Sequence, residues 1–111
     1  MNHKKPIFNS QPDLKVLFQF NGKRRYTIAD GFCADHLITD GKKIHGKHNY
    51  YCSLFISPNG RSNGTITFLK SEKHIPCLRK DDTFPIYDGD DIIGHALVLH
   101  VLNPALAIQS E

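Results

Sequence analysis

The sequence predicts a small all-β, single-domain protein folded as an antiparallel β-barrel. Its apolar residues fall in short runs, and no stretch shows the period of a long amphipathic helix. Asn-Gly and Asp-Gly pairs separate these runs, and such pairs favour the positive φ angles of tight turns. The chain has 111 residues, which suffices for one hydrophobic core without disulfides. Short strands with one apolar face are typical of small barrels, where that face is buried.

The predicted strands are the apolar runs, taken in chain order. They cover residues 15–20, 25–28, 36–38, 50–56, 64–69, 84–87 and 92–102. The turn pairs are Asn21-Gly22, Asp30-Gly31, Asp40-Gly41, Asn59-Gly60, Asn63-Gly64 and Asp88-Gly89. In the run 64–69, Ile66 and Phe68 alternate with Thr65 and Thr67, so one face of that strand is apolar. The barrel domain is therefore predicted to span residues 15–104.

The segments on either side of the barrel are predicted to be flexible. Residues 1–14 are polar, contain Pro6 and Pro12 and show no periodicity, which indicates a mobile N-terminal arm. Residues 105–111 are predicted to form a flexible C-terminal tail. In the last strand, His95 and His100 are expected on opposite faces, one packed and one exposed at the rim. These two imidazoles are therefore not expected to chelate one metal ion.

The composition is compatible with several classes of partner. Lys and Arg number 14 and Asp and Glu 11, so the net charge of +3 permits RNA, DNA or an acidic protein. No apolar run has the length of a secretory signal or of a membrane-spanning helix. Cys33, Cys52 and Cys77 are an odd and widely spaced set, typical of reduced thiols. We therefore predict a cytoplasmic protein without a membrane segment or a cofactor.

Two basic segments and one acidic turn contain the candidate binding residues. The first basic segment is predicted to be a loop and includes Lys42, Lys43, His45, Lys47, His48 and Tyr50. Its lysines can contact phosphates and its tyrosines can stack on bases, although a solvated loop leading into a strand explains the same residues. The second basic segment is Lys23, Arg24 and Arg25, and the acidic turn holds Asp88, Asp90 and Asp91.

Metal binding and catalysis have weaker signals. His45, His48 and Cys52 have a spacing that only loosely resembles a zinc site, which needs four ligands, so no metal is predicted. No phosphate-binding loop, nucleophile elbow or dinucleotide fingerprint is present. A metal-independent ribonuclease built from His36, His45, His48 and a lysine is a minority hypothesis, with the side chains acting as acid, base and phosphate ligand. The protein is accordingly not predicted to be an enzyme.

Three segments resemble the C-terminal β-barrel of translation elongation factor Tu. Gly22-Lys23-Arg24-Arg25 and the residues up to His36 resemble its Gly-Gly-Arg stretch, and residues 65–69 resemble its middle strand. Residues 84–94 resemble its closing turn and strand. The resemblance implies a compact barrel without the GTPase domain, with Arg24 and Arg25 near a tRNA backbone. Asp90 and Asp91 stand where that family has Gly and Arg, so carboxylates lie where a phosphate should approach.

These observations favour a non-catalytic binding module that acts through a charged barrel surface on a protein partner. One alternative is an immunity protein that neutralises a secreted bacterial toxin by covering its active site. Another is a barrel that binds tRNA or structured RNA. The charges support the first reading, because basic residues gather between Lys23 and Lys47 and acidic residues gather in the last third of the chain.

Overall fold

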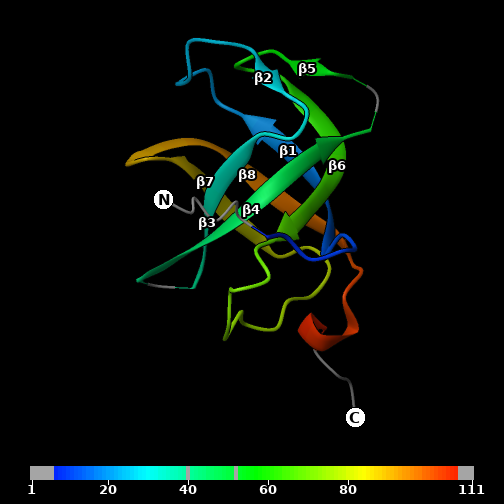
Figure 1. The fold of residues 1–111 in the computed structure, drawn as a ribbon. Helices are drawn as coiled ribbons and strands as arrows, with labels where there is room; N and C mark the ends of the chain where they lie inside the picture. The colour runs from blue at the N-terminus through cyan, green and yellow to red at the C-terminus, as the bar shows by residue number, and fades with distance from the viewer. Residues whose placement is uncertain (1–6, 40, 52, 108–111) are drawn as a thin grey trace, which may run out of the picture.

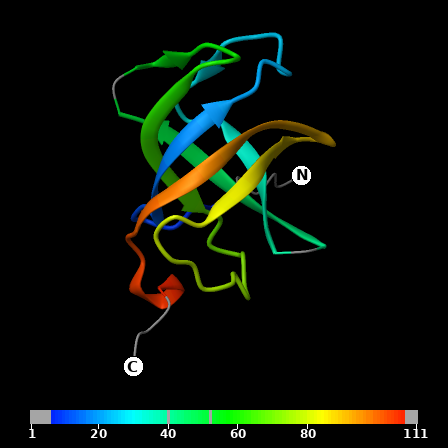
Figure 2. The same ribbon diagram turned by 180° about the vertical axis from the view of Figure 1, so that it is seen from behind.

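The computed structural model describes residues 7–39, 41–51 and 53–107, which form a closed antiparallel barrel (Figure 1). Around the barrel, the strands follow the order β1-β6-β4-β3-β7-β8. Their bounds are β1 Leu14–Phe20, β3 Cys33–Thr39, β4 Lys42–Tyr50, β6 Arg61–Phe68, β7 Thr83–Asp88 and β8 Asp91–Val101. The barrel closes where β8 lies beside β1 (Figure 2). The predicted all-β single-domain barrel is therefore confirmed.

The core consists of side chains that alternate along each strand. In β1, Leu14, Val16, Phe18 and Phe20 point inward, because successive side chains of a strand point to opposite faces. The other strands contribute Ile44, Ile66, Phe68, Phe84, Ile86, Ile93, Ala96 and Val98. Gly64 lets two strands and a core ring come close together, since a Cβ there would collide with the Asn49 carbonyl oxygen and with Phe18.

A two-stranded sheet covers one end of the barrel. It consists of β2 Ile28–Ala29 and β5 Phe55–Ile56, which pair in antiparallel fashion. Ile28 and Ile56 are buried, whereas Ala29 and Phe55 are exposed. We call residues 21–32, Tyr51 and residues 53–61 the cap. In Figure 1 the cap lies at the opposite end of the molecule from the short 3-10 helix η1 Pro104–Leu106.

The segment predicted to be a loop before residue 50 is instead the long strand β4. Lys43, His45, Lys47 and Asn49 alternate with inward residues that include a glycine and a histidine, so the apolar periodicity is hidden. The run predicted as a strand at 50–56 is interrupted after Tyr50, and only Phe55–Ile56 form β5. Tyr51 lies just beyond the end of β4, and its backbone N–H still donates to the Asn63 carbonyl of β6 over 3.0 Å.

Parts of both predicted flexible segments are packed against the barrel. Asp13, which was predicted in the arm, is buried, and its carboxylate accepts hydrogen bonds from Asn9 Nδ2, from Asn103 Nδ2 and from the Phe68 backbone N–H. Leu106, predicted in the tail, is also buried, and its carbonyl accepts a 2.7 Å hydrogen bond from the backbone N–H of Leu78. Residues 1–6 and 108–111 lie outside the described part of the chain.

His95 and His100 are both exposed, so the expectation that they lie on opposite faces is wrong. The reason is a bulge in β8. Lys15 is opposite His100, but Val16 is opposite Val98, so Leu99 is an extra residue that reverses the alternation beyond it. Cys33 and Cys77 are free, whereas Cys52 lies outside the described residues. Within the part of the chain that the structure describes, no helix is long and apolar enough to span a membrane.

Candidate binding surface

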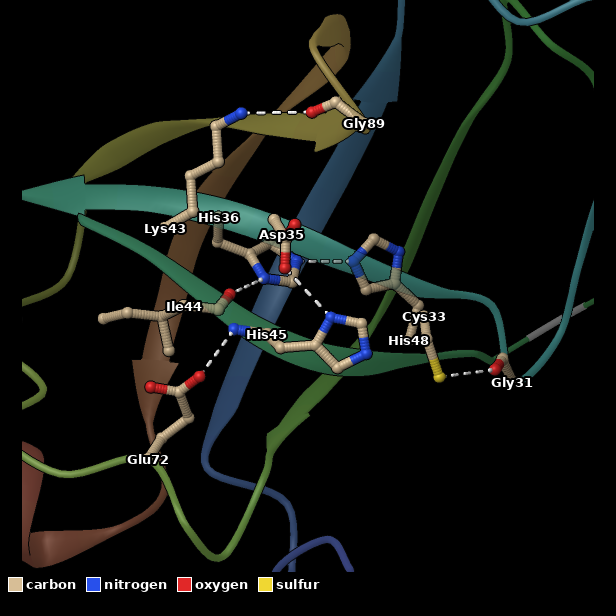
Figure 3. Close-up of polar contacts among 10 residues, drawn as sticks. All are labelled: Gly31, Cys33, Asp35, His36, Lys43, Ile44, His45, His48, Glu72 and Gly89. Atoms are coloured by element: carbon tan, nitrogen blue, oxygen red, sulfur yellow. Dashed lines mark hydrogen bonds and ion pairs between the residues drawn. The ribbon is translucent and has the colours of Figure 1, made fainter. Parts of the chain in front are cut away.

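Two of the predicted binding residues, His48 and Tyr50, lie in the core and not on the surface. His48 is fully buried and Tyr50 is 6% exposed, because both point inward from β4. His48 Nε2 lies 2.7 Å from His36 Nε2 (Figure 3). His48 Nδ1 lies 3.0 Å from the Tyr50 hydroxyl. His36 Nδ1 lies 2.9 Å from the Ile44 carbonyl oxygen, which completes a buried chain of four groups.

The chain has one consistent proton arrangement when both imidazoles are neutral. The Ile44 carbonyl can only accept, so His36 carries its proton on Nδ1 and accepts on Nε2 from His48. The Tyr50 hydroxyl then donates to His48 Nδ1. Burial lowers the pKa of His36 to about 4 and, together with the nearby His36, holds the pKa of His48 well below its usual range. Burial also raises the pKa of Tyr50, which keeps its hydroxyl protonated.

This burial removes two of the three histidines that the sequence nominated for a ribonuclease. His36 and His48 are fully buried and have no access to a substrate, whereas His45 points outward from β4. His45 Nδ1 lies 2.9 Å from the Asp35 carboxylate, and both side chains are about one-third exposed. Burial raises the pKa of the neighbouring Cys33 thiol, and Lys47 only partly opposes this effect. Of these three histidines, His45 is therefore the one that reaches the surface.

Lys43 and Lys47 lie on the outer face of β4, and Lys42 is exposed at the start of the strand. Each of these predicted lysines contacts another part of the protein. Lys42 Nζ lies 3.8 Å from Glu72 and donates to the Lys73 carbonyl. Lys43 Nζ lies 3.8 Å from Asp90, donates to the Gly89 carbonyl and sits over the Tyr87 ring. Lys47 Nζ is 5.1 Å from the centre of the Phe8 ring.

The second basic segment and the acidic turn meet in space. Arg24 Nη1 forms a 2.6 Å ion pair with Asp88, and its guanidinium lies 4.5 Å from the centre of the Phe32 ring. Asn21 also joins the β1–β2 loop to the start of β8, since its Nδ2 donates to the Ile92 carbonyl and its backbone N–H donates to that of Ile93. The loop with Lys23 and Arg25 therefore lies beside the turn with Asp90 and Asp91.

The sequence reasoning missed a group of exposed apolar residues on the cap. Among the described residues, the most exposed large apolar side chains are Tyr26 at 75%, Leu54 at 72%, Ile7 at 66% and Phe55 at 61%. Three of these four, together with the half-exposed Tyr51, belong to the cap. The signal in the sequence was the nearly continuous apolar run 50–56, whose side chains cannot all face the core from one strand.

The structure also has a groove that lies away from the predicted binding residues. This groove of about 410 Å³ lies at the end away from the cap, and its walls include Asn9, Asp13, Lys70, Leu102 and Asn103. None of the predicted binding residues lines it.

No group of three or more His, Cys, Asp or Glu side chains within the described ranges is arranged to hold a metal ion.

Comparison with known proteins finds no matching family model and no curated protein of significantly similar sequence.

Proposed function

We propose that this protein is a non-catalytic binding module that recognises another protein through its charged barrel surface. The observation that carries the proposal is the ion pair between Arg24 of the β1–β2 loop and Asp88 of the β7–β8 turn. Lys43 of β4 extends the pattern, because its ammonium group lies 3.8 Å from Asp90 on the same turn. Charges of both signs are thus side by side, a pattern that complements a protein surface and provides specificity and fast association.

Binding of tRNA or structured RNA is the less favoured function. A phosphate backbone that approached Lys43 would also approach the Asp90 carboxylate, which is 3.8 Å from its ammonium group. Lys42 is similarly engaged by Glu72. Because RNA affinity comes mainly from lysines and arginines that neutralise phosphates, cations already paired with carboxylates contribute little.

The resemblance of residues 22–36 and 84–94 to the C-terminal barrel of elongation factor Tu supports the same proposal, because that barrel meets protein partners as well as tRNA. The free thiols of Cys33 and Cys77 support a cytoplasmic location. A specific form of the proposal is an immunity protein, whose partner is a secreted toxin. In that case the product of a neighbouring gene is the first partner to test by co-expression and co-purification.

The test is capture of a partner from a nuclease-treated lysate, followed by titration of the purified partner against this protein in a calorimeter. Bulk tRNA is titrated in parallel at low salt. We expect a saturable complex with the purified protein and no binding of tRNA. The proposal is overturned by tRNA binding that weakens steeply with salt and is lost in Lys42→Ala/Lys43→Ala/Lys47→Ala. Lys70→Ala/Lys73→Ala/Lys80→Ala is the matched control.

A further inference from the structure

We infer that the cap is the docking site, and that its occupant is an acidic protein segment with an apolar anchor. This inference rests on the proposed protein-binding function and names the surface and the chemistry of the partner. The first observation is the concentration of exposed apolar side chains on the cap, where Tyr26, Leu54 and Phe55 are each more than 60% exposed. Single exposed apolar residues are ordinary, but a group of them at one end of the barrel, from the β1–β2 loop and from β5 and the residue before it, marks an interaction site.

The structure of the cap explains why these side chains face solvent. Ile28 and Ile56 close the end of the barrel core, and the pairing of β2 with β5 forces Phe55 onto the outer face beside Ala29. The Leu54 carbonyl accepts the Asp30 backbone N–H over 2.8 Å, which fixes the chain next to Phe55. The outer face is therefore presented by hydrogen-bonded backbone, and little ordering is needed on binding.

The charge of the cap determines the chemistry of the partner. The cap contains Lys23, Arg24, Arg25 and Arg61 but a single acidic residue, Asp30, so its net charge of +3 equals that of the whole chain. The Asp30 carboxylate is already engaged by the barrel, because it accepts a 2.7 Å hydrogen bond from the backbone N–H of Tyr50 in β4. Lys23, Arg25 and Arg61 are all exposed. Carboxylates around an apolar anchor complement this arrangement, since aromatic and arginine residues dominate protein interfaces.

Basic and aromatic residues together also suit a single-stranded nucleic acid, but the border of the cap disfavours one. Arg24 is paired with Asp88, and Asn21 holds the cap against the turn that carries Asp90 and Asp91. A continuous polyanion that crossed the cap would meet these carboxylates. A protein segment avoids this repulsion, because its acidic residues can stop before the carboxylates at the border of the cap.

The test uses the full chain and three probes, measured by fluorescence polarisation. The probes are a random copolymer of glutamate and tyrosine, poly-L-glutamate, and poly(U) RNA. We expect the copolymer to bind more tightly than poly-L-glutamate. Its affinity should fall on the order of tenfold in Lys23→Glu/Arg25→Glu and in Phe55→Ser, the loss typical of removing an interface anchor.

Matched controls at the other end of the molecule are Lys70→Glu/Lys80→Glu for charge and Leu102→Ser for apolar exposure. All substituted residues are exposed, so each variant should keep the melting temperature of the wild type. The inference is overturned if poly(U) binds more tightly than the copolymer, if the copolymer does not bind, or if the control variants lose as much affinity. A captured partner whose affinity is unchanged by the cap variants overturns the docking site but leaves the proposed function standing.

Discussion

The buried His36–His48 pair should make the protein lose stability in mild acid. The unfolded chain binds a proton on each histidine near the ordinary pKa of about 6.5, whereas the folded protein keeps His36 neutral down to about pH 4. Between these values the unfolded state holds more protons, so the free energy of unfolding falls as the pH falls. His36 alone accounts for about 2 kcal/mol between about pH 7 and pH 5. His48 shifts in the same direction and adds to the loss.

The measurement is urea unfolding at several pH values within this window, where most carboxylates are still ionised. His95→Gln changes an exposed histidine and should leave the pH dependence intact. His36→Leu/His48→Leu should lower stability at every pH, because it leaves the Ile44 carbonyl and the Tyr50 hydroxyl without partners, but it should flatten the pH dependence.

An NMR titration of the wild-type protein tests the same reasoning without any variant. The imidazole signals of His36 and His48 should not titrate between about pH 7 and pH 5, and their nitrogen shifts should show the two tautomers assigned above. A His36 signal that titrates near its ordinary pKa, or a free energy of unfolding that is the same at both ends of the window, would refute the argument.

Three further changes test the packing. Asp13→Ala leaves the buried Phe68 N–H unpaired and removes the hydrogen bonds of Asn9 and Asn103. Urea unfolding should therefore show that the free energy of unfolding falls by about 3 kcal/mol. Asp90→Ala, which changes a fully exposed side chain, should alter it little. Gly64→Ala places a Cβ against the Asn49 carbonyl and should lower the melting temperature far more than Gly41→Ala does. A Cβ at Gly41 meets no neighbouring atom, so its cost is the positive φ angle alone, about 1 kcal/mol. Arg24→Ala breaks a partly exposed ion pair, so stability should fall by about 1 kcal/mol or less while amide exchange in residues 21–27 accelerates; unchanged exchange there would mean that Asp88 does not hold the loop.

The fold class was predictable because it depends on local signals. Strand β7, strand β8 and the turns at Gly22, Gly31 and Gly89 follow from apolar runs and from residues that tolerate positive φ, and the structure places all three glycines in that region. Strand β4 was not predictable in the same way. Its inward positions include Gly46, which has no side chain, and His48, which is polar. His48 can be buried only because His36 of β3 forms a hydrogen bond with it, and the sequence of β4 does not show that partner.

The candidate surface was predictable only in part, because its composition is visible in the sequence but its assembly depends on contacts between distant strands. The sequence shows a basic segment at Lys23–Arg25 and an acidic turn at Asp88, but only the pairing of distant strands brings them within 2.6 Å. The exposure of Phe55 depends on the two-residue pairing of β2 with β5, which is too short to give a periodic signal. The position of His100 depends on one extra residue in β8, and a bulge leaves no mark in the pattern of residue types.

The pairing of β1 also has a consequence for how the chain reaches its fold. β1 is hydrogen-bonded to β6 on one side and to β8 on the other, and Leu14 lies opposite both Ile66 and Val101. When β1 leaves the ribosome, neither β6 nor β8 has been synthesised. The four inward-facing apolar side chains of β1 therefore stay exposed to solvent until the last strand emerges. Folding should therefore complete late and slowly, with nascent β1 a natural site for chaperone binding.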